Sequence, residues 1–115
     1  MSNTSIVSAL ADLHAAVEGT AGVAAVYDHE PTKPADKSAS IVWTGMDAER
    51  FRFDLRIYVK VQDARASQHA LYTLIQAVEQ KLTVQFSVGE WIVAFNPESQ
   101  VLMGTLSTVS GREDY

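Results

Sequence analysis

The sequence has no cysteine among its 115 residues. This absence excludes disulfides, thiol nucleophiles and thiolate metal sites, and it leaves the chain indifferent to the redox state of its compartment. Long apolar runs are missing as well, because stretches such as "VAAVY" and "WIVAF" are far too short to span a bilayer. The opening "MSNTSIVSALADLHAAV" has no basic start and contains Asp12, so we expect no signal peptide and a soluble, intracellular protein.

The chain also lacks the motifs of common catalytic and nucleotide-binding sites. Its six glycines are scattered, which excludes a glycine-rich phosphate loop, and there is no G-x-S-x-G sequence. Asp47 and Glu49 lie beside a predicted turn, and we interpret them as polar turn residues. Of His14, His29 and His69, only His29 has possible ligands beside it ("DHE"), and a metal would need further ligands from elsewhere, so a solvated loop is favoured. We therefore expect a protein that is not an enzyme, with no catalytic residue, cofactor or metal.

Apolar residues recur at helical spacing in two segments. Ile6, Leu10, Leu13 and Val17 define the face of a first helix that ends near Gly19. A second helix is predicted over residues 64–82, with Asp63 as its N-cap. Its buried face consists of the following residues: Leu71, Leu74, Ile75, Val78 and Leu82.

Segments rich in β-formers lie between and after the helices. "VAAVY" predicts a short strand. "DHEPTKPADK" predicts a loop that is longer than most connections between two strands. "SASIVW" and "RFRFDLRIYVKV" predict a hairpin around the turn "TGMD", and residues 91–95 and 100–109 predict two closing strands. Residues 1–115 thus form a single α+β domain, in the order helix, strand, strand, strand, helix, strand, strand, and residues 111–115 are expected to be a loose tail. The sheet should be mainly antiparallel, with both helices on its apolar face.

The second hairpin strand carries an unusual concentration of positive charge. Four of the nine basic residues, Arg50, Arg52, Arg56 and Lys60, share one side of it, and we call these four residues the basic stripe. Residues 50–65 hold five basic and two acidic side chains, a net charge of +3, whereas the rest of the chain holds four basic and twelve acidic ones, a net charge of -8. The chain is therefore polarised rather than evenly acidic.

Three interpretations of the basic stripe remain open. The simplest is the solvated face of a half-buried strand, on which long basic side chains also protect a sheet edge from aggregation. A second is a contact surface for the acidic body of another copy, because unlike surfaces that meet head to tail can close into a ring. The third is nucleic-acid binding, and a pI near 5.0 argues against a dedicated binder.

In the order of its helices and strands, the sequence resembles the tail terminator proteins of long-tailed bacteriophages, chiefly of those with non-contractile tails. The resemblance covers about residues 4–110. It rests on the opening helix "IVSALADLHAAV", the strand "VAAVYD" with its proline-bearing loop, the hairpin "SASIVW"/"RFRFDLRIYVKV", the helix segment "QDARASQHALYTLIQAVEQKL" and a β-rich last third. Related neck proteins, the tail-completion and head–tail joining factors, share much of this pattern and remain an alternative.

The resemblance implies a structural virion protein without enzymatic activity. Such a protein forms a homo-oligomeric ring, expected to be a hexamer, that binds the major tail tube protein, stops polymerisation of the tube and presents a surface to the head-side connector protein. It would reside at the head–tail junction of the virion, and in the host cytoplasm during assembly. DNA would pass through its lumen without specific binding, and no membrane is involved.

Two sets of residues are candidates for these contacts. The basic stripe is assigned to the subunit interface or the lumen. Loops suit axial docking because they change without disturbing the sheet, and we consider the 28–38 loop, the 45–48 turn and the 96–100 turn. Within the first of these, the residues assigned to docking are Asp28, Glu30, Lys33 and Lys37. A small α+β enzyme or ligand-binding domain, and a DNA-contacting accessory protein, are the competing hypotheses.

Overall fold

The computed structural model describes residues 6–29, 31–47, 50–61, 63–83, 86–97 and 100–111. Two helices and six strands follow one another along these segments. In chain order they are α1 (Ile6–Glu18), β1 (Ala25–Tyr27), β2 (Ser38–Asp47), β3 (Arg50–Lys60), α2 (Ala64–Leu82), β4 (Phe86–Ser87), β5 (Trp91–Asn96) and β6 (Val101–Gly111).

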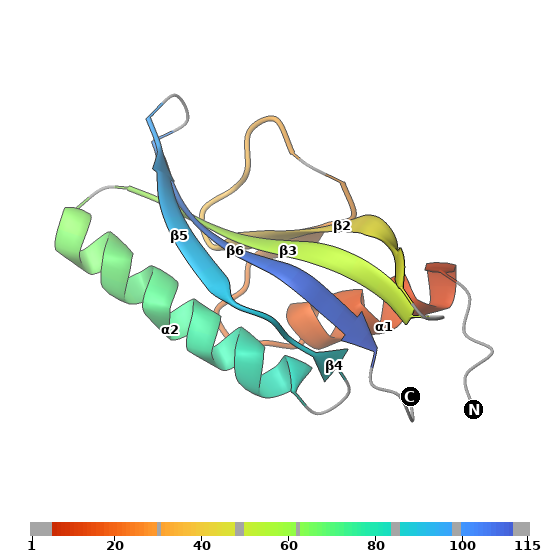
Figure 1. The fold of residues 1–115 in the computed structure, drawn as a ribbon. Coiled ribbons are helices and arrows are strands. Elements are labelled where there is room, and N and C mark those ends of the chain that lie inside the picture. The colour runs from red at the N-terminus through yellow and green to blue at the C-terminus, as the bar shows by residue number, and fades with distance from the viewer. Residues whose placement is uncertain are drawn as a thin grey trace.

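The strands form one sheet in the order β1-β2-β3-β6, and β6 pairs on its other side with both β4 and β5. All pairings are antiparallel except that of β1 with β2, which is parallel. Both helices lie against the same face of this sheet, which we call the helix-covered face. The described residues between β1 and β2, 28–29 and 31–37, rise on the opposite, open face (Figure 1). The expected α+β fold, with its mainly antiparallel sheet and two helices, is confirmed.

Local sequence accounts for the point where α1 ends and the point where α2 begins. The α1 helix stops at Glu18, where Gly19 N donates to Ala15 O at 2.9 Å. The α2 helix begins where Asp63 Oδ1 accepts from Ala66 N at 3.0 Å, which satisfies one of the amides that a helix start leaves unpaired. The prediction of Asp63 as N-cap and of a helix over 64–82 is therefore confirmed.

The core lies between the helices and the helix-covered face. Alternate β3 residues supply its centre, and all of them are at most 2% exposed: Phe53, Leu55, Ile57 and Val59. Gly104 on β6 lets α2 approach closely, since a Cβ added there would lie 2.8 Å from Ile75 Cδ1. This contact explains why a residue without a side chain occupies the middle of a long strand.

The hairpin formed by β2 and β3 is longer than predicted. The expected 45–48 turn is wrong in its first three residues, because β2 continues to Asp47, which pairs with Arg50. Register shifts occur between Trp43 and Gly45 on β2 and between Phe53 and Leu55 on β3. Irregularities of this kind bend a strand and increase its twist, so the residues after Trp43 continue pairing in an altered direction.

Three smaller differences concern strand extents. The β1 strand covers only part of "VAAVY", and the short β4 strand had no expected counterpart. Gly111 belongs to β6 and pairs with Phe86, whereas residues 112–115 of the expected tail lie outside the described residues.

Candidate functional site

The basic stripe lies on the open face, in the centre of the sheet. The β3 strand has β2 on one side and β6 on the other, so the stripe does not protect a sheet edge, and that part of the solvated-face interpretation is wrong. Arg52 and Arg56 are half-buried and Lys60 is exposed. The side chain of Arg50 lies outside the described residues.

Tyr58 interrupts the stripe. It shares the face of Arg56 and Lys60, yet it is only 5% exposed, and its hydroxyl lies 2.9 Å from Ser40 Oγ on β2. This hydrogen bond satisfies two buried hydroxyls inside the sheet surface. Tyr58 is the residue that alternation in the sequence misplaced, because the pattern assigned it to the solvated side.

The open face is partly covered by residues 28–37, which we call the crossover loop because they join the parallel strands β1 and β2. Asp36 Oδ1 accepts from the backbone N of Lys60 at 2.9 Å, and Ser38 Oγ donates to Ala35 O at 2.6 Å. Pro34 is buried. The loop that we expected to be available for docking is therefore fastened to the sheet along its second half.

The four loop residues assigned to docking occupy different surroundings. Asp28 accepts a hydrogen bond from His29 Nδ1 at 3.2 Å, and this contact lowers the pKa of the Asp28 carboxyl below its ordinary value. Lys37 is exposed and has a backbone φ of 57°, a left-handed conformation that is uncommon for lysine. Glu30 lies outside the described residues, and Lys33 contributes to a groove described next.

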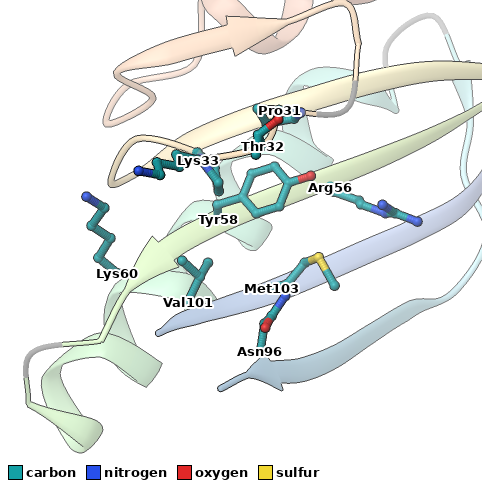
Figure 2. A pocket seen from close by; sticks show the side chains of 10 residues that line it. Pro31, Thr32, Lys33, Arg56, Tyr58, Lys60, Asn96, Val101 and Met103 are labelled. Atoms are coloured by element: carbon teal, nitrogen blue, oxygen red, sulfur yellow. The ribbon is translucent and has the colours of Figure 1, made fainter. Parts of the chain in front are cut away.

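A groove of about 570 Å³ lies on the open face between the crossover loop and the outer strands. Figure 2 shows residues 31–34 of the loop along one side and Asn96, Val101 and Met103 along the other, with the ring of Tyr58 between them. We call this feature the groove. Its volume lies within the range of pockets that hold small molecules or short peptide segments.

The charged side chains among the described residues that line the groove are all positive. Lys33 and Lys60 lie at one end, and the guanidinium group of Arg56 points toward the other (Figure 2). No acidic residue is among the described residues that line the groove. Neither lysine ammonium makes an ion pair within 4.0 Å in the part of the chain that the structure describes. This arrangement favours a ligand that carries negative charge and also has an apolar part to cover Met103.

A second unusual surface is the outer edge of the sheet at β5. This strand pairs only with β6 among the described strands, and three of its side chains are exposed by 44–61%: Ile92, Val93 and Phe95. At its start, Trp91 packs against α2 and donates through Nε1 to Glu79 Oε1 at 3.1 Å. Trp43 on β2 is also exposed, by 45%.

Sequence reasoning found the cations of the groove but missed the groove itself. Arg56 and Lys60 were singled out as a stripe and Lys33 as a loop residue, with no signal that linked them. The link is the parallel pairing of β1 with β2, which brings the crossover loop over β3. The two prolines at positions 31 and 34 were the available hint of an ordered loop.

Within the described residues, no group of three or more His, Asp or Glu side chains is placed to hold a metal ion. The described helices include none that is both long and apolar enough to cross a membrane. Comparison with known proteins found no matching family model and no matching curated protein sequence.

Proposed function

We propose that the chain is a ring-forming structural protein of the phage tail terminator type. In this role several copies close into a ring, expected to be hexameric, that caps the tail tube and offers its other side to the head-side connector. The role requires no catalysis, and it needs surfaces that recognise a second copy. The proposal combines the element order seen in the sequence with two surfaces of the fold.

The observation that carries the proposal is the outer edge of β5. Soluble proteins usually blunt an edge strand with charge, proline or a covering segment, because unpaired strands with apolar side chains promote association. Here Ile92, Val93 and Phe95 are exposed on such an edge. Pairing of this edge with another copy would bury these side chains.

The charge distribution supports a head-to-tail contact of unlike surfaces. Residues 50–65 have a net charge of +3 on a chain whose remaining residues sum to -8. Such a contact steers partners and fixes their register more than it adds affinity. If the rotation between copies closes, it generates a ring rather than a filament.

The test is the mass of the purified protein by native mass spectrometry, with negative-stain images. We expect a closed ring, alone or on tail tubes, and tubes that stop growing when the protein is added. Ile92→Lys should prevent ring formation without unfolding the monomer. The matched control is Tyr72→Lys, because Tyr72 is 52% exposed, against 61% for Ile92, and lies on α2 rather than on the sheet edge. A protein that neither forms rings nor stops elongation contradicts the proposal.

Substitution of both Arg52 and Arg56 by glutamate tests the charge contribution. Because both arginines are half-buried, circular dichroism must first show that the variant is folded. Ring assembly should then fail, since glutamates would face the acidic surface of the next copy. Normal rings from this variant would mean that the basic stripe is only a solvated face. A ring that binds no tube would favour another head–tail joining protein.

The same two arginines distinguish the proposal from a DNA-contacting accessory protein. That alternative predicts a DNA affinity that falls steeply with salt and is lost when Arg52 and Arg56 are replaced by alanine. The proposed ring predicts no such affinity for the isolated protein.

A further inference from the structure

We propose that the groove binds the acidic segment Glu113–Asp114 of a neighbouring copy. The inference rests on the proposed function, because it supplies one of the contacts between subunits. It assigns to the groove an occupant that carries negative charge and an aromatic residue, and it gives Lys33 and Lys60 a common role.

The groove has the chemistry that such a segment requires. Lys33 and Lys60 lie at the same end of it, and neither makes an ion pair within the described part of the chain (Figure 2). Next to them lies Met103, a partly exposed side chain whose thioether suits contact with an aromatic ring. No acidic residue is among the described residues that line the groove, and the nearby Asp36 carboxylate is held by the backbone N of Lys60.

The sequence offers one segment that matches. Among fourteen acidic residues, only Glu113 and Asp114 are adjacent in sequence, and Tyr115 follows them directly. Two carboxylates can therefore meet the two ammonium groups while the tyrosine ring covers the apolar part of the groove. Charge-assisted contacts of this kind are stronger than neutral hydrogen bonds.

The length of the chain excludes binding within one subunit. Met103 lines the groove and Gly111 ends the strand. The eight steps along β6 from one to the other span roughly 26 Å at the usual rise per residue. Asp114 is three residues past Gly111 and reaches at most about 11 Å from it. The groove that receives this segment must belong to another copy, and a repeated contact of this type is head to tail.

A charge exchange in the full-length chain tests the inference. Lys33→Glu with Lys60→Glu should weaken assembly, and so should Glu113→Lys with Asp114→Lys, because each pair places like charges together. Combining the four changes should restore the assembly, since the ion pairs form again with reversed sign. Circular dichroism and thermal melting should show all variants folded. If both pairs leave the assembly intact, or if the combination is no better than the weaker pair, the inference is overturned.

A peptide experiment separates this inference from the proposed function. A fluorescent peptide with the sequence of residues 110–115 is titrated into the Glu113→Gln, Asp114→Asn variant, whose grooves its own tail should not fill. We expect binding that weakens with salt and falls about tenfold in affinity when Lys33→Glu and Lys60→Glu are added. The control peptide carries Gln and Asn in place of the two acidic residues. Its affinity for the groove should be no higher than that of the acidic peptide for the variant with both lysines changed.

The outcomes are distinguishable. If the protein never forms rings but the peptide binds at the groove, the proposed function fails and the groove assignment stands. If rings form and the peptide does not bind, or binds equally well after both lysines are changed, the groove assignment fails and the proposed function stands. Displacement of the peptide by duplex DNA at equal charge concentration would also overturn the assignment, because it would indicate a general site for polyanions.

Discussion

The two faces of β3 show how one strand serves two purposes. Phe53, Leu55 and Ile57 point to the helix-covered face and are buried by α1 and α2. Arg56 and Lys60 point to the open face, where only a loop and the outer strands partly cover them. The helix-covered face has no groove or charge among these residues, whereas the open face has both. The difference indicates that the core is built on one face, and it leaves the open face for the contacts proposed above.

The largest expected contrast compares one truncation on each face. Leu55 has no exposed surface, so Leu55→Ala removes buried methyl groups and leaves a cavity, and it should cost about 3 kcal/mol of unfolding free energy. Arg52→Ala on the open face should cost less than about 0.5 kcal/mol. Urea denaturation followed by circular dichroism measures both. Similar losses for the two variants would break the comparison.

A second contrast tests the contact between β6 and α2. Gly104→Val places side-chain atoms where Ile75 already lies, and overpacking of this kind should cost about 2 kcal/mol although valine favours strands. The neighbour Thr105 lies on the open face, and Thr105→Val should be near neutral by the same measurement. Adding Ile75→Ala to Gly104→Val should recover part of the loss. A stable Gly104→Val variant would mean that α2 does not approach β6 so closely.

The third prediction concerns the hydrogen bond between the buried hydroxyls of Ser40 on β2 and Tyr58 on β3, on the open face. Tyr58→Phe removes the hydroxyl that contacts Ser40 and should cost about 1 kcal/mol. Ser40→Ala should cost a similar amount, and the double variant should cost less than the sum of the two, because both remove the same bond. Strictly additive losses would show that the hydroxyls stabilise the sheet independently.

The smallest effect is expected at the solvent-exposed start of the crossover loop. The hydrogen bond from His29 holds the pKa of Asp28 below its ordinary value, so His29→Ala should raise that pKa back toward it. Because the lowered pKa belongs to the folded state, the contribution to stability is complete above the ordinary carboxylate pKa and is lost as pH falls through the lowered one. Carboxyl NMR titration of the two proteins measures the change. An unchanged Asp28 titration would contradict the assigned cause.

Much of the fold was predictable from the sequence because its patterns are local. The alternation along β3 identified the buried residues, and Asp63 identified the start of α2. The 45–48 turn failed for a physical reason, since "TGMD" contains turn-forming residues that the longer hairpin accommodates with a register shift near Gly45. Turn chemistry alone does not show where a hairpin ends.

The candidate site was less predictable, because it depends on contacts between distant segments. The sequence shows that Lys33, Arg56 and Lys60 are basic, but not that a loop folds back over the strand. Tyr58 was misplaced for the same reason, since its burial comes from the crossover loop and from Ser40 rather than from the helices. The exposed edge at β5 was also hidden, because "WIVAF" is typical of a buried strand.

The parallel pairing of β1 with β2 has a consequence for how this protein can vary. Two antiparallel strands can be joined by a tight turn, but two parallel strands need a longer connection that returns the chain to the end of the sheet where the first strand began. Residues 28–37 make this return, since Ala25 at the start of β1 pairs with Ser38 at the start of β2. A shortened loop could not keep β1 paired with β2, and the side of the groove that residues 31–34 form would be lost. Insertions, by contrast, would merely enlarge the overhang, so natural variants should lengthen this segment far more readily than trim it.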